Sequence, residues 1–296
     1  MRIVSIGECM VEMAPTDTGN FAMGFAGDTF NTAWYLRQAL PSDWQVDYAT
    51  AIGDDRISDR MLAFFHSEGI GTQHVRRIPG AGVGLYMITL DGTERSFVYW
   101  RTASAARHLA EDESPLAAAL QGARMAYLSG ITLAILPEKD RDRLFAALAT
   151  ARAAGTLIVF DPNMRPRLWP DPATMRAMIV RAASVSDIVL PSFDEEAVQF
   201  LDRHPSETAR RYAQAGARMV VVKNGAGEMI AWQGEEETSF SPPAAQRVVD
   251  TTAAGDSFNA GFLAAHLTGA PLLSALAEGS ALARRAIGAR GALVRG

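Results

Sequence analysis

The sequence has few of the features that would place a protein outside the cytosol or on a nucleic acid. It contains one cysteine, Cys9, which excludes an intrachain disulfide and fits a reducing compartment. We find no charged-then-apolar signal segment at the start and no apolar run near the length of a membrane span. The 28 basic residues form no run typical of nucleic-acid binding, and 33 acidic residues give a net charge of −5. We therefore expect a cytoplasmic protein with no membrane or nucleic-acid partner.

Two common nucleotide-binding signatures are also missing. The segment Lys223-Asn224-Gly225-Ala226-Gly227-Glu228 has two glycines in a dinucleotide-type spacing, but the third would fall at position 230, which is isoleucine. A Walker A sequence is absent. These absences argue against a dinucleotide oxidoreductase and exclude a P-loop enzyme.

From about residue 120 onward, strand and helix patterns alternate. We expect strands at 124–129, 156–160, 188–190 and 219–223, and helices over 138–154, 172–183 and within 194–215. Continuous apolar strands separated by helices indicate an α/β fold whose mostly parallel central sheet is covered by helices on both faces. Ligands of such folds bind beyond the C-terminal ends of the strands. The polar residues expected at those ends are Asp161, Asn163, Ser192, Lys223 and Asn224.

The N-terminal third departs from this rhythm. After a first strand over 2–8, Met10 to Met13 alternate in polarity, and two further alternating segments, 84–90 and 95–100, flank Asp91-Gly92-Thr93-Glu94. Asp-Gly between alternating segments is a strong hairpin signal. We interpret these strands as a small β-sheet lid, formed by about 8–25 and 83–102, on a single α/β domain that covers residues 1–296. Its expected role is to cover the active site, to form a dimer surface, or both.

The most informative segment is Asp250-Thr251-Thr252-Ala253-Ala254-Gly255-Asp256-Ser257-Phe258. A turn of small residues opens directly into an apolar helix with a carboxylate, Asp256, at the junction. Unpaired N–H groups at a helix start attract phosphate and other anions, and a carboxylate there can accept a proton from a hydroxyl. This combination suits phosphoryl transfer to an alcohol. By itself, the segment is equally compatible with an ordinary capped helix.

A second segment, Gly24-Phe25-Ala26-Gly27-Asp28-Thr29-Phe30-Asn31, presents Asp28 and Asn31 ahead of a helix expected near 28–40. Taken alone it favours a simple helix entry capped by Asp28 or Thr29. Together, however, the two segments resemble the two signatures of the ribokinase-like (PfkB) carbohydrate kinases, in the right order and across nearly the whole chain. The resemblance implies that Gly27, Asp28 and Asn31 bind the sugar. It also implies that Ala253, Ala254 and Gly255 form an anion hole and that Asp256 is the catalytic base.

Other segments are similar to the branch of this family that phosphorylates 2-keto-3-deoxygluconate at its 6-hydroxyl. They are Ile6-Gly7-Glu8-Cys9-Met10, Phe97-Val98-Tyr99-Trp100-Arg101, Leu128-Ser129-Gly130-Ile131-Thr132 and Asp161-Pro162-Asn163-Met164-Arg165. An acidic sugar calls for arginine, whose planar fork binds carboxylates in bidentate fashion. We expect Arg101, at the end of a lid strand, and Arg165, beyond a strand of the main sheet, to have this role. Tyr86 and Tyr99 are further candidates, and alternation places Tyr99 and Arg101 on one strand face with Trp100 on the other.

For the nucleotide, the resemblance implies ATP as co-substrate together with Mg²⁺, and family analogy adds a monovalent cation near Asp250 and Thr251. The ATP-binding residues it suggests are Asn163, Ser192, Lys223, Gly225, Gly227, Thr251, Ala254 and Gly255. The family's metal-associated N-x-x-E motif corresponds here to Ser192-Phe193-Asp194-Glu195. Glu195 retains the glutamate of the motif and would act on Mg²⁺ through a water. Ser192 replaces the asparagine of the motif, which leaves the role of Ser192 open.

Two physical expectations follow for the base and the anion hole. A helix start favours an ionised carboxylate, so we expect Asp256 to be deprotonated at neutral pH. The segment reads Ala-Ala-Gly where the family has Gly-Ala-Gly, so we expect residue 253 to have a negative φ angle that alanine tolerates.

The sequence leaves several alternatives open. They are a kinase of the same family acting on a neutral sugar such as fructose, ribose or a nucleoside, and a sugar-binding regulator that has lost catalysis. It does not separate 2-keto-3-deoxygluconate from its galactonate epimer. We expect a homo-oligomer, a dimer or larger, because an appended lid sheet often pairs across a dimer.

Overall fold

The computed structural model describes residues 1–16, 18–91 and 94–295, with the side chains of 90–95 left out. The strands of this part of the chain are β1 (Arg2–Ile6), β2 (Met10–Pro15), β3 (Phe21–Ala26), β4 (Gln45–Ile52), β5 (Val75–Arg77), β6 (Leu85–Asp91), β7 (Glu94–Trp100), β8 (Met125–Ser129), β9 (Leu157–Asp161), β10 (Ile188–Val189), β11 (Met219–Val222), β12 (Met229–Gln233) and β13 (Glu236–Phe240). The helices are α1 (Asp28–Ala39), α2 (Arg56–Ser67), α3 (Glu113–Leu120), α4 (Gly130–Ile135), α5 (Glu138–Ala153), α6 (Pro172–Ser184), α7 (Phe193–Phe200), α8 (Pro205–Ala215), α9 (Ala254–Leu267) and α10 (Leu272–Ile287), with short 3₁₀ helices η1 (Ala105–His108) and η2 (Pro166–Leu168).

The main sheet has nine strands in the order β13-β12-β11-β10-β9-β8-β1-β4-β5. The strands from β11 to β5 run parallel, whereas β12 and β13 pair antiparallel at one edge. The parallel register aligns the ends of neighbouring strands; for example, Ser129 of β8 lies opposite Asp161 of β9. The polar residues that follow these strands therefore meet along one edge of the sheet.

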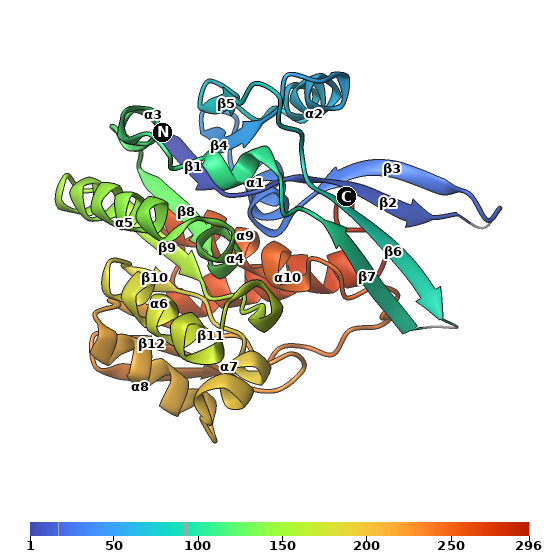
Figure 1. Cartoon of the computed structure of the whole chain (residues 1–296). Helices are drawn as coiled ribbons and strands as arrows, with labels where there is room; N and C mark the ends of the chain where they lie inside the picture. The colour runs from blue at the N-terminus through green and yellow to red at the C-terminus, as the bar shows by residue number, and fades with distance from the viewer. Residues whose placement is uncertain (17, 92–93, 296) are drawn as a thin grey trace.

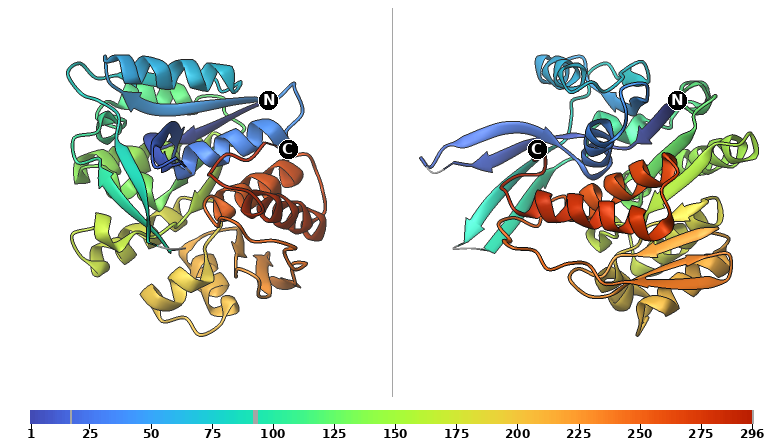
Figure 2. Two further views of the ribbon diagram at one scale, coloured as in Figure 1. Left: turned by 90° about the vertical axis from the view of Figure 1, so that its right-hand side faces the viewer. Right: turned by 180° about the vertical axis from the view of Figure 1, so that it is seen from behind.

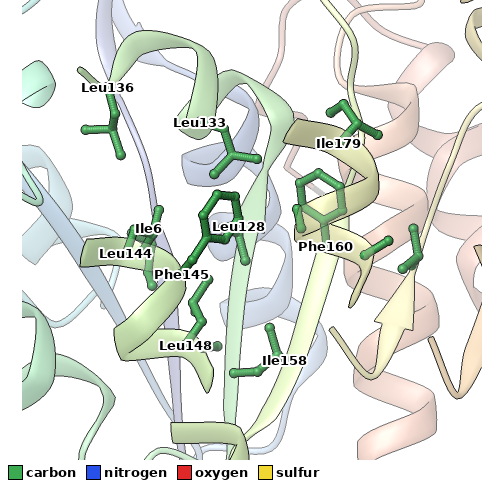
Figure 3. Packing of buried hydrophobic residues seen from close by; sticks show 14 of the residues in the cluster. Ile6, Leu128, Leu133, Leu136, Leu144, Phe145, Leu148, Ile158, Phe160 and Ile179 are labelled. Atoms are coloured by element: carbon green, nitrogen blue, oxygen red, sulfur yellow. The ribbon is translucent and has the colours of Figure 1, made fainter. Parts of the chain in front are cut away.

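Helices cover both faces of this sheet (Figures 1 and 2). Alternate residues of β9 point to opposite faces, so Ile158 and Phe160 pack on one side and Val159 on the other. Helices α4, α5 and α6 pack over the first side, where Leu128, Phe145 and Ile179 are buried (Figure 3). The other face is covered by α1, α2, α9 and α10. The predicted parallel sheet with two helical layers is confirmed.

A second, four-stranded sheet has the order β3-β2-β6-β7 and extends away from the main body (Figure 1). Its β2 and β3 are consecutive antiparallel strands, and β2 also pairs in parallel with β6. The β6–β7 hairpin predicted from Asp-Gly is present, although its turn residues Gly92 and Thr93 lie outside the described residues. This sheet corresponds to the predicted lid strands, and its function as a lid remains a prediction.

The strands and helices expected after residue 120 are found within two residues of their predicted limits. The sequence analysis did not assign β4 and α2, which belong to the main fold within the N-terminal third. Strand β4 is almost wholly buried beside β1, so it belongs to the parallel sheet and not to the small one. Within the described part of the chain, no helix is long and apolar enough to cross a membrane.

Candidate active site

Helix α9 begins at the predicted junction, and its start is shaped by a tight turn. The carboxylate of Asp250 accepts hydrogen bonds from the backbone N–H and the hydroxyl of Thr252, at 3.0 and 2.7 Å, and from the N–H of Gly291 at 2.7 Å. Ala253 then caps the helix, and Asp256 lies in its first turn. The turn leaves the first N–H groups of the helix without intrahelical partners, as every helix start does.

Our expectation of a negative φ at residue 253 is wrong. Ala253 has φ 59° and ψ 18°, which is the left-handed region. This conformation costs alanine roughly 1–2 kcal/mol relative to its usual backbone geometry. Two hydrogen bonds from Ser257 to the carbonyl oxygen of Ala253, at 2.9 Å from N–H and 2.7 Å from Oγ, hold it in place.

The two signature segments meet at Asp256. The side-chain amide of Asn31 donates to Oδ2 of Asp256 at 2.8 Å, and both residues are buried. Asp28, three residues before Asn31, accepts a hydrogen bond from the amide of Asn163 at 2.7 Å. Four predicted site residues, from α1, the segment after β9 and α9, thus form two hydrogen-bonded pairs.

The expectation that Asp256 is fully ionised at neutral pH is also wrong. Burial, and then the nearby charge of Asp28, raise the pKa of Asp256 from 3.8 to about 7. The hydrogen bond from Asn31 and the charge of Lys223 oppose this rise but do not cancel it, while Asp161 adds to it. The effect of the helix start is outweighed because several carboxylates share one buried space. A pKa near the working pH suits a general base.

Gly27 is required by the space around the turn before α1. A Cβ on Gly27 would lie 2.2 Å from the carbonyl oxygen of Glu8, so any side chain would push the turn away from the end of β1. Beyond Gly27, a cavity of about 320 Å³ lies along β3, and its lining includes Glu12, Gly24, Ala26 and Arg60. Asp28, Asn31 and Asp256 are not among the residues that line this cavity, so it adjoins the turn without including the proposed base.

Lys223 lies beneath the start of α9. Its Nζ is 3.1 Å from Oδ2 of Asp161 and 3.2 Å from Oδ1 of Asn259, and the residue is buried. The same amine would lie 3.5 Å from a Cβ on Gly255, so its charge lies directly behind the proposed anion hole. The charge of Lys223 therefore lies inside the protein, next to the start of α9, and not on the surface.

Sequence reasoning missed two members of this buried network. Asn259 donates to Oδ2 of Asp161 at 2.6 Å and to the hydroxyl of Tyr127 at 3.0 Å. The position of Asn259, three residues after Asp256, was the available signal, because residues i and i+3 share one helix face. Tyr127 lies within a strand whose residues are otherwise small or apolar, and no sequence signal distinguished it.

The remaining predicted ATP residues surround the same edge of the sheet. Gly225 and Gly227 form an exposed turn after Lys223, closed by a hydrogen bond from the N–H of Gly227 to the carbonyl of Asn224 at 2.7 Å. Ser192 caps α7 and pairs with Lys223 through an isolated bridge. Thr251 is exposed at the turn before α9. The contacts of these residues with ATP remain predictions.

On the lid, Tyr86 and Tyr99 are cross-strand partners with ring centroids 5.9 Å apart. Tyr86 is buried and donates its hydroxyl to the carboxylate of Glu12, and burial raises the pKa of Tyr86 well above its usual value. The guanidinium of Arg101 lies 5.9 Å from the ring centroid of Tyr99, in agreement with the predicted shared face. Arg101 also forms a buried ion pair with Glu8, which accepts a second hydrogen bond from Ser104.

Arg165 and Glu195 form an ion pair at 2.6 Å, and the Arg165 side chain is 47% exposed. The expected metal-associated residue thus binds the expected sugar-binding arginine. Among the described residues, no group of three or more His, Cys, Asp or Glu side chains could hold a metal ion. Mg²⁺ that enters with a nucleotide usually keeps several waters and takes substrate phosphates as ligands.

Comparison with known proteins agrees with this geometry. Residues 1–294 match the model of the pfkB family of carbohydrate kinases. The chain is 39% identical to a 2-dehydro-3-deoxygluconokinase of Dickeya dadantii (strain 3937), over 99% of this chain and 96% of that protein. It is 37% identical to the 2-dehydro-3-deoxygluconokinase of Escherichia coli (strain K12), over 99% and 97% of the two chains.

Among solved structures, the PfkB protein from Polaromonas sp. JS666 superposes with a TM-score of 0.86 at 28% identity. The match covers 97% of this chain and 95% of that one. The family model, the full-length relatives and the paired signatures agree, and we conclude that the chain belongs to the pfkB family of carbohydrate kinases and is an ATP-dependent sugar kinase.

Proposed function

We propose that the protein transfers the γ-phosphate of ATP to the 6-hydroxyl of 2-keto-3-deoxygluconate, also called 2-dehydro-3-deoxygluconate. The products are 2-keto-3-deoxy-6-phosphogluconate and ADP. The observation that carries the proposal is the buried contact between Asn31 and Asp256, which joins the sugar-side turn to a carboxylate at a helix start. The names of the full-length relatives support the choice of sugar.

In this proposal Asp256 is the general base. Its pKa of about 7 allows it to accept the 6-hydroxyl proton near neutral pH. Asn31 holds the carboxylate through a hydrogen bond to Oδ2, which leaves Oδ1 to face the sugar hydroxyl. In phosphoryl transfer most of the catalysis comes from positioning and electrostatic stabilisation, so a base of this strength suffices.

The backbone N–H groups of residues 253–256 would receive the charge that develops on the transferred phosphoryl group. Lys223 supports them, because its buried amine lies behind Gly255. Removing a single donor of this kind costs roughly 10²–10³ in rate in other enzymes. The exposed turn at Gly225 and Gly227, with Asn163, Ser192 and Thr251, would bind the rest of the nucleotide.

Recognition of the sugar's carboxylate is assigned to Arg165 and Arg101, with Tyr86 and Tyr99 lining the lid side. Arg165 is the more accessible of the two: its side chain is 47% exposed, against 9% for Arg101. We therefore expect Arg165 to contribute more to the choice of an acidic sugar. Gly27, Asp28 and Asn31 would bind the hydroxyl groups.

Mg²⁺ would enter with ATP and neutralise charge on its phosphates, with Glu195 placed to orient a water of the ion. A monovalent cation near Asp250 and Thr251 is proposed by family analogy only. The apolar side chains of Val98 and Trp100 are 44% and 55% exposed on the lid, which supports a homo-oligomer built through this sheet. Closure of the sheet over the sugar, and a cytoplasmic location, are part of the same proposal.

A coupled ADP-release assay tests the proposal directly. It would compare 2-keto-3-deoxygluconate, its galactonate epimer, fructose, ribose and a nucleoside, each with MgATP. We expect the highest kcat/KM with one of the two acids. A preference for a neutral sugar would mean that the protein is a neutral-sugar kinase of the same family. If no sugar increased ADP release, the protein would be a sugar-binding regulator without catalysis.

A further inference from the structure

The side chain of Glu195 makes contacts that a purely metal-associated role does not explain. It lies in the first turn of α7, and its side chain is 23% exposed. Its Oε2 accepts the backbone N–H of Met164 at 2.9 Å, and its Oε1 accepts Nη1 of Arg165 at 2.6 Å. Both carboxylate oxygens are therefore bound to the loop that follows β9.

These contacts fix the orientation of the Arg165 guanidinium. Nη1 has two N–H donors: one is directed to Glu195 and the other to the carbonyl of Met164 at 2.7 Å. Within the described residues, Nε and Nη2 of Arg165 have no hydrogen-bond partner. The edge of the guanidinium that remains free carries three N–H groups, and two of them are parallel and match the two oxygens of a carboxylate.

The loop that Glu195 holds is also part of the sugar side of the site. Asn163, two residues before Arg165, donates to Asp28 at 2.7 Å. Burial opposes the charge on Arg165, but Glu195 and then Asp28 and Asp256 outweigh it and raise the pKa of Arg165. The hydrogen bond from Asn163 thus joins the loop that carries Arg165 to the proposed sugar-binding residue Asp28.

We propose that Glu195 is a positioning residue for the acidic sugar: it holds Met164 and Nη1 of Arg165 so that the Nε–Nη2 edge of Arg165 receives the substrate carboxylate. This inference rests on the proposed function, because it assigns a role in recognising that substrate. In this proposal, Glu195, expected near the metal, and Arg165, expected at the sugar, act together in binding the sugar. Selection for an acidic sugar then depends on a residue that does not touch the sugar.

The fold should survive removal of Glu195, which makes the inference testable. A partly exposed ion pair contributes roughly 0–1 kcal/mol to stability, and Glu195 belongs to no hydrophobic cluster. Asp194 is the matched control: it is the preceding acidic residue in the same helical turn, it is exposed, and its side chain forms no hydrogen bond or ion pair within the described residues. Thermal unfolding of each variant would verify that the fold is intact.

The decisive experiment measures sugar binding with no metal and no nucleotide present. Isothermal titration calorimetry in EDTA would give the Kd of 2-keto-3-deoxygluconate for the wild type, Glu195→Ala, Glu195→Gln and Asp194→Asn. We expect about tenfold weaker binding for Glu195→Ala, because an oriented charge-assisted pair is lost. Glu195→Gln should be intermediate, since its amide oxygen still accepts one hydrogen bond, and Asp194→Asn should match the wild type.

The same titrations include outcomes that would overturn the inference. If Glu195 served only a metal-bound water, removing it would leave binding in EDTA unchanged. A double variant adds a second criterion: Glu195→Ala should add little to Arg165→Ala if Glu195 acts through Arg165. Additive losses would mean that Glu195 acts by another route. Absence of binding to the wild-type protein would instead contradict the proposed substrate, so the two failures are distinguishable.

Discussion

Asn31 donates its side-chain amide to Oδ2 of Asp256 at 2.8 Å, although the two residues are 225 positions apart in the chain. The contact joins α1 to α9 in their first turns, where both signature segments continue into their helices. It also restrains the orientation of the carboxylate, because one of its oxygens accepts this hydrogen bond. The first predictions concern this pair.

Replacing Asp256 by Asn should leave a folded protein that binds the sugar but turns over slowly. The amide fills the same space but cannot accept a proton, and loss of a general base typically costs roughly 10²–10⁴ in rate. The measurements are kcat from ADP release and the sugar Kd from calorimetry. Turnover close to that of the wild type would remove Asp256 as the base.

The rate should depend on pH through the same carboxyl group. Because burial and Asp28 raise the pKa of Asp256 to about 7, kcat/KM should rise with pH up to about 7 and level off above it. The apparent pKa belongs to Asp256 together with the carboxylates around it. A profile from pH 5.5 to 8.5 checks this, and a flat profile would contradict it.

Stability should show the opposite trend. The folded-state pKa of Asp256 is raised above its unfolded value of 3.8, so the folded protein binds the proton more tightly. The stabilisation is fully present below pH 4 and is lost as the pH rises to about 7. Since Asp256→Asn has no proton to lose, its Tm relative to the wild type should increase between pH 5 and pH 8. A constant difference would refute the raised pKa.

Replacing Ala253 by Gly should stabilise the protein. Glycine adopts the left-handed conformation of this position without the penalty that alanine incurs, so we expect a gain of about 1 kcal/mol, or about 2 °C in Tm. Ala254→Gly is the matched comparison and should destabilise, because residue 254 is helical. The same sign for both variants would mean that the backbone at 253 is not strained.

The substrate preference should depend on Arg165. Arg165→Ala should lower kcat/KM for the acidic sugar at least tenfold, with a much smaller effect on any neutral sugar that the enzyme accepts, because only the acid uses a bidentate pair. Arg167→Ala is the matched control, since Arg167 is exposed and its side chain forms no hydrogen bond or ion pair within the described residues. Equal losses on acidic and neutral sugars would make Arg165 structural.

Lys223→Met should affect stability and the pH profile together. It leaves Asp161 buried without its cation, and breaking a buried pair typically costs about 3–5 kcal/mol. Because the charge of Lys223 lowers the pKa of Asp256, its loss should move the inflection of the rate profile to higher pH. Lys139→Met, at an exposed site, should change neither property. An unshifted inflection would show that Lys223 and Asp256 are not electrostatically linked.

The sequence predicted the alternating strands and helices after residue 120, the β6–β7 hairpin and both signature segments, because each of these depends on local residue patterns. It failed on Ala253, since a left-handed alanine is stabilised by Ser257 hydrogen bonds that the residue pattern does not reveal. It failed on the protonation of Asp256 because the burial that raises the pKa of this carboxyl, and then the nearby charges of Asp28 and Asp161, arise only in the folded chain. The pairing of Arg101 with Glu8, across 93 residues, was hidden for the same reason.

The order of strands in the main sheet has a consequence for how the enzyme is made. Strand β1 lies between β4 and β8, so its neighbours are synthesised after it, and α9 is synthesised later still. A nascent chain therefore carries Asp28 and Asn31 long before it carries Asp256, the proposed base. In the proposed mechanism, phosphate transfer then begins only when α9 packs on α1, near the end of synthesis, and partly made chains would not consume ATP through this site.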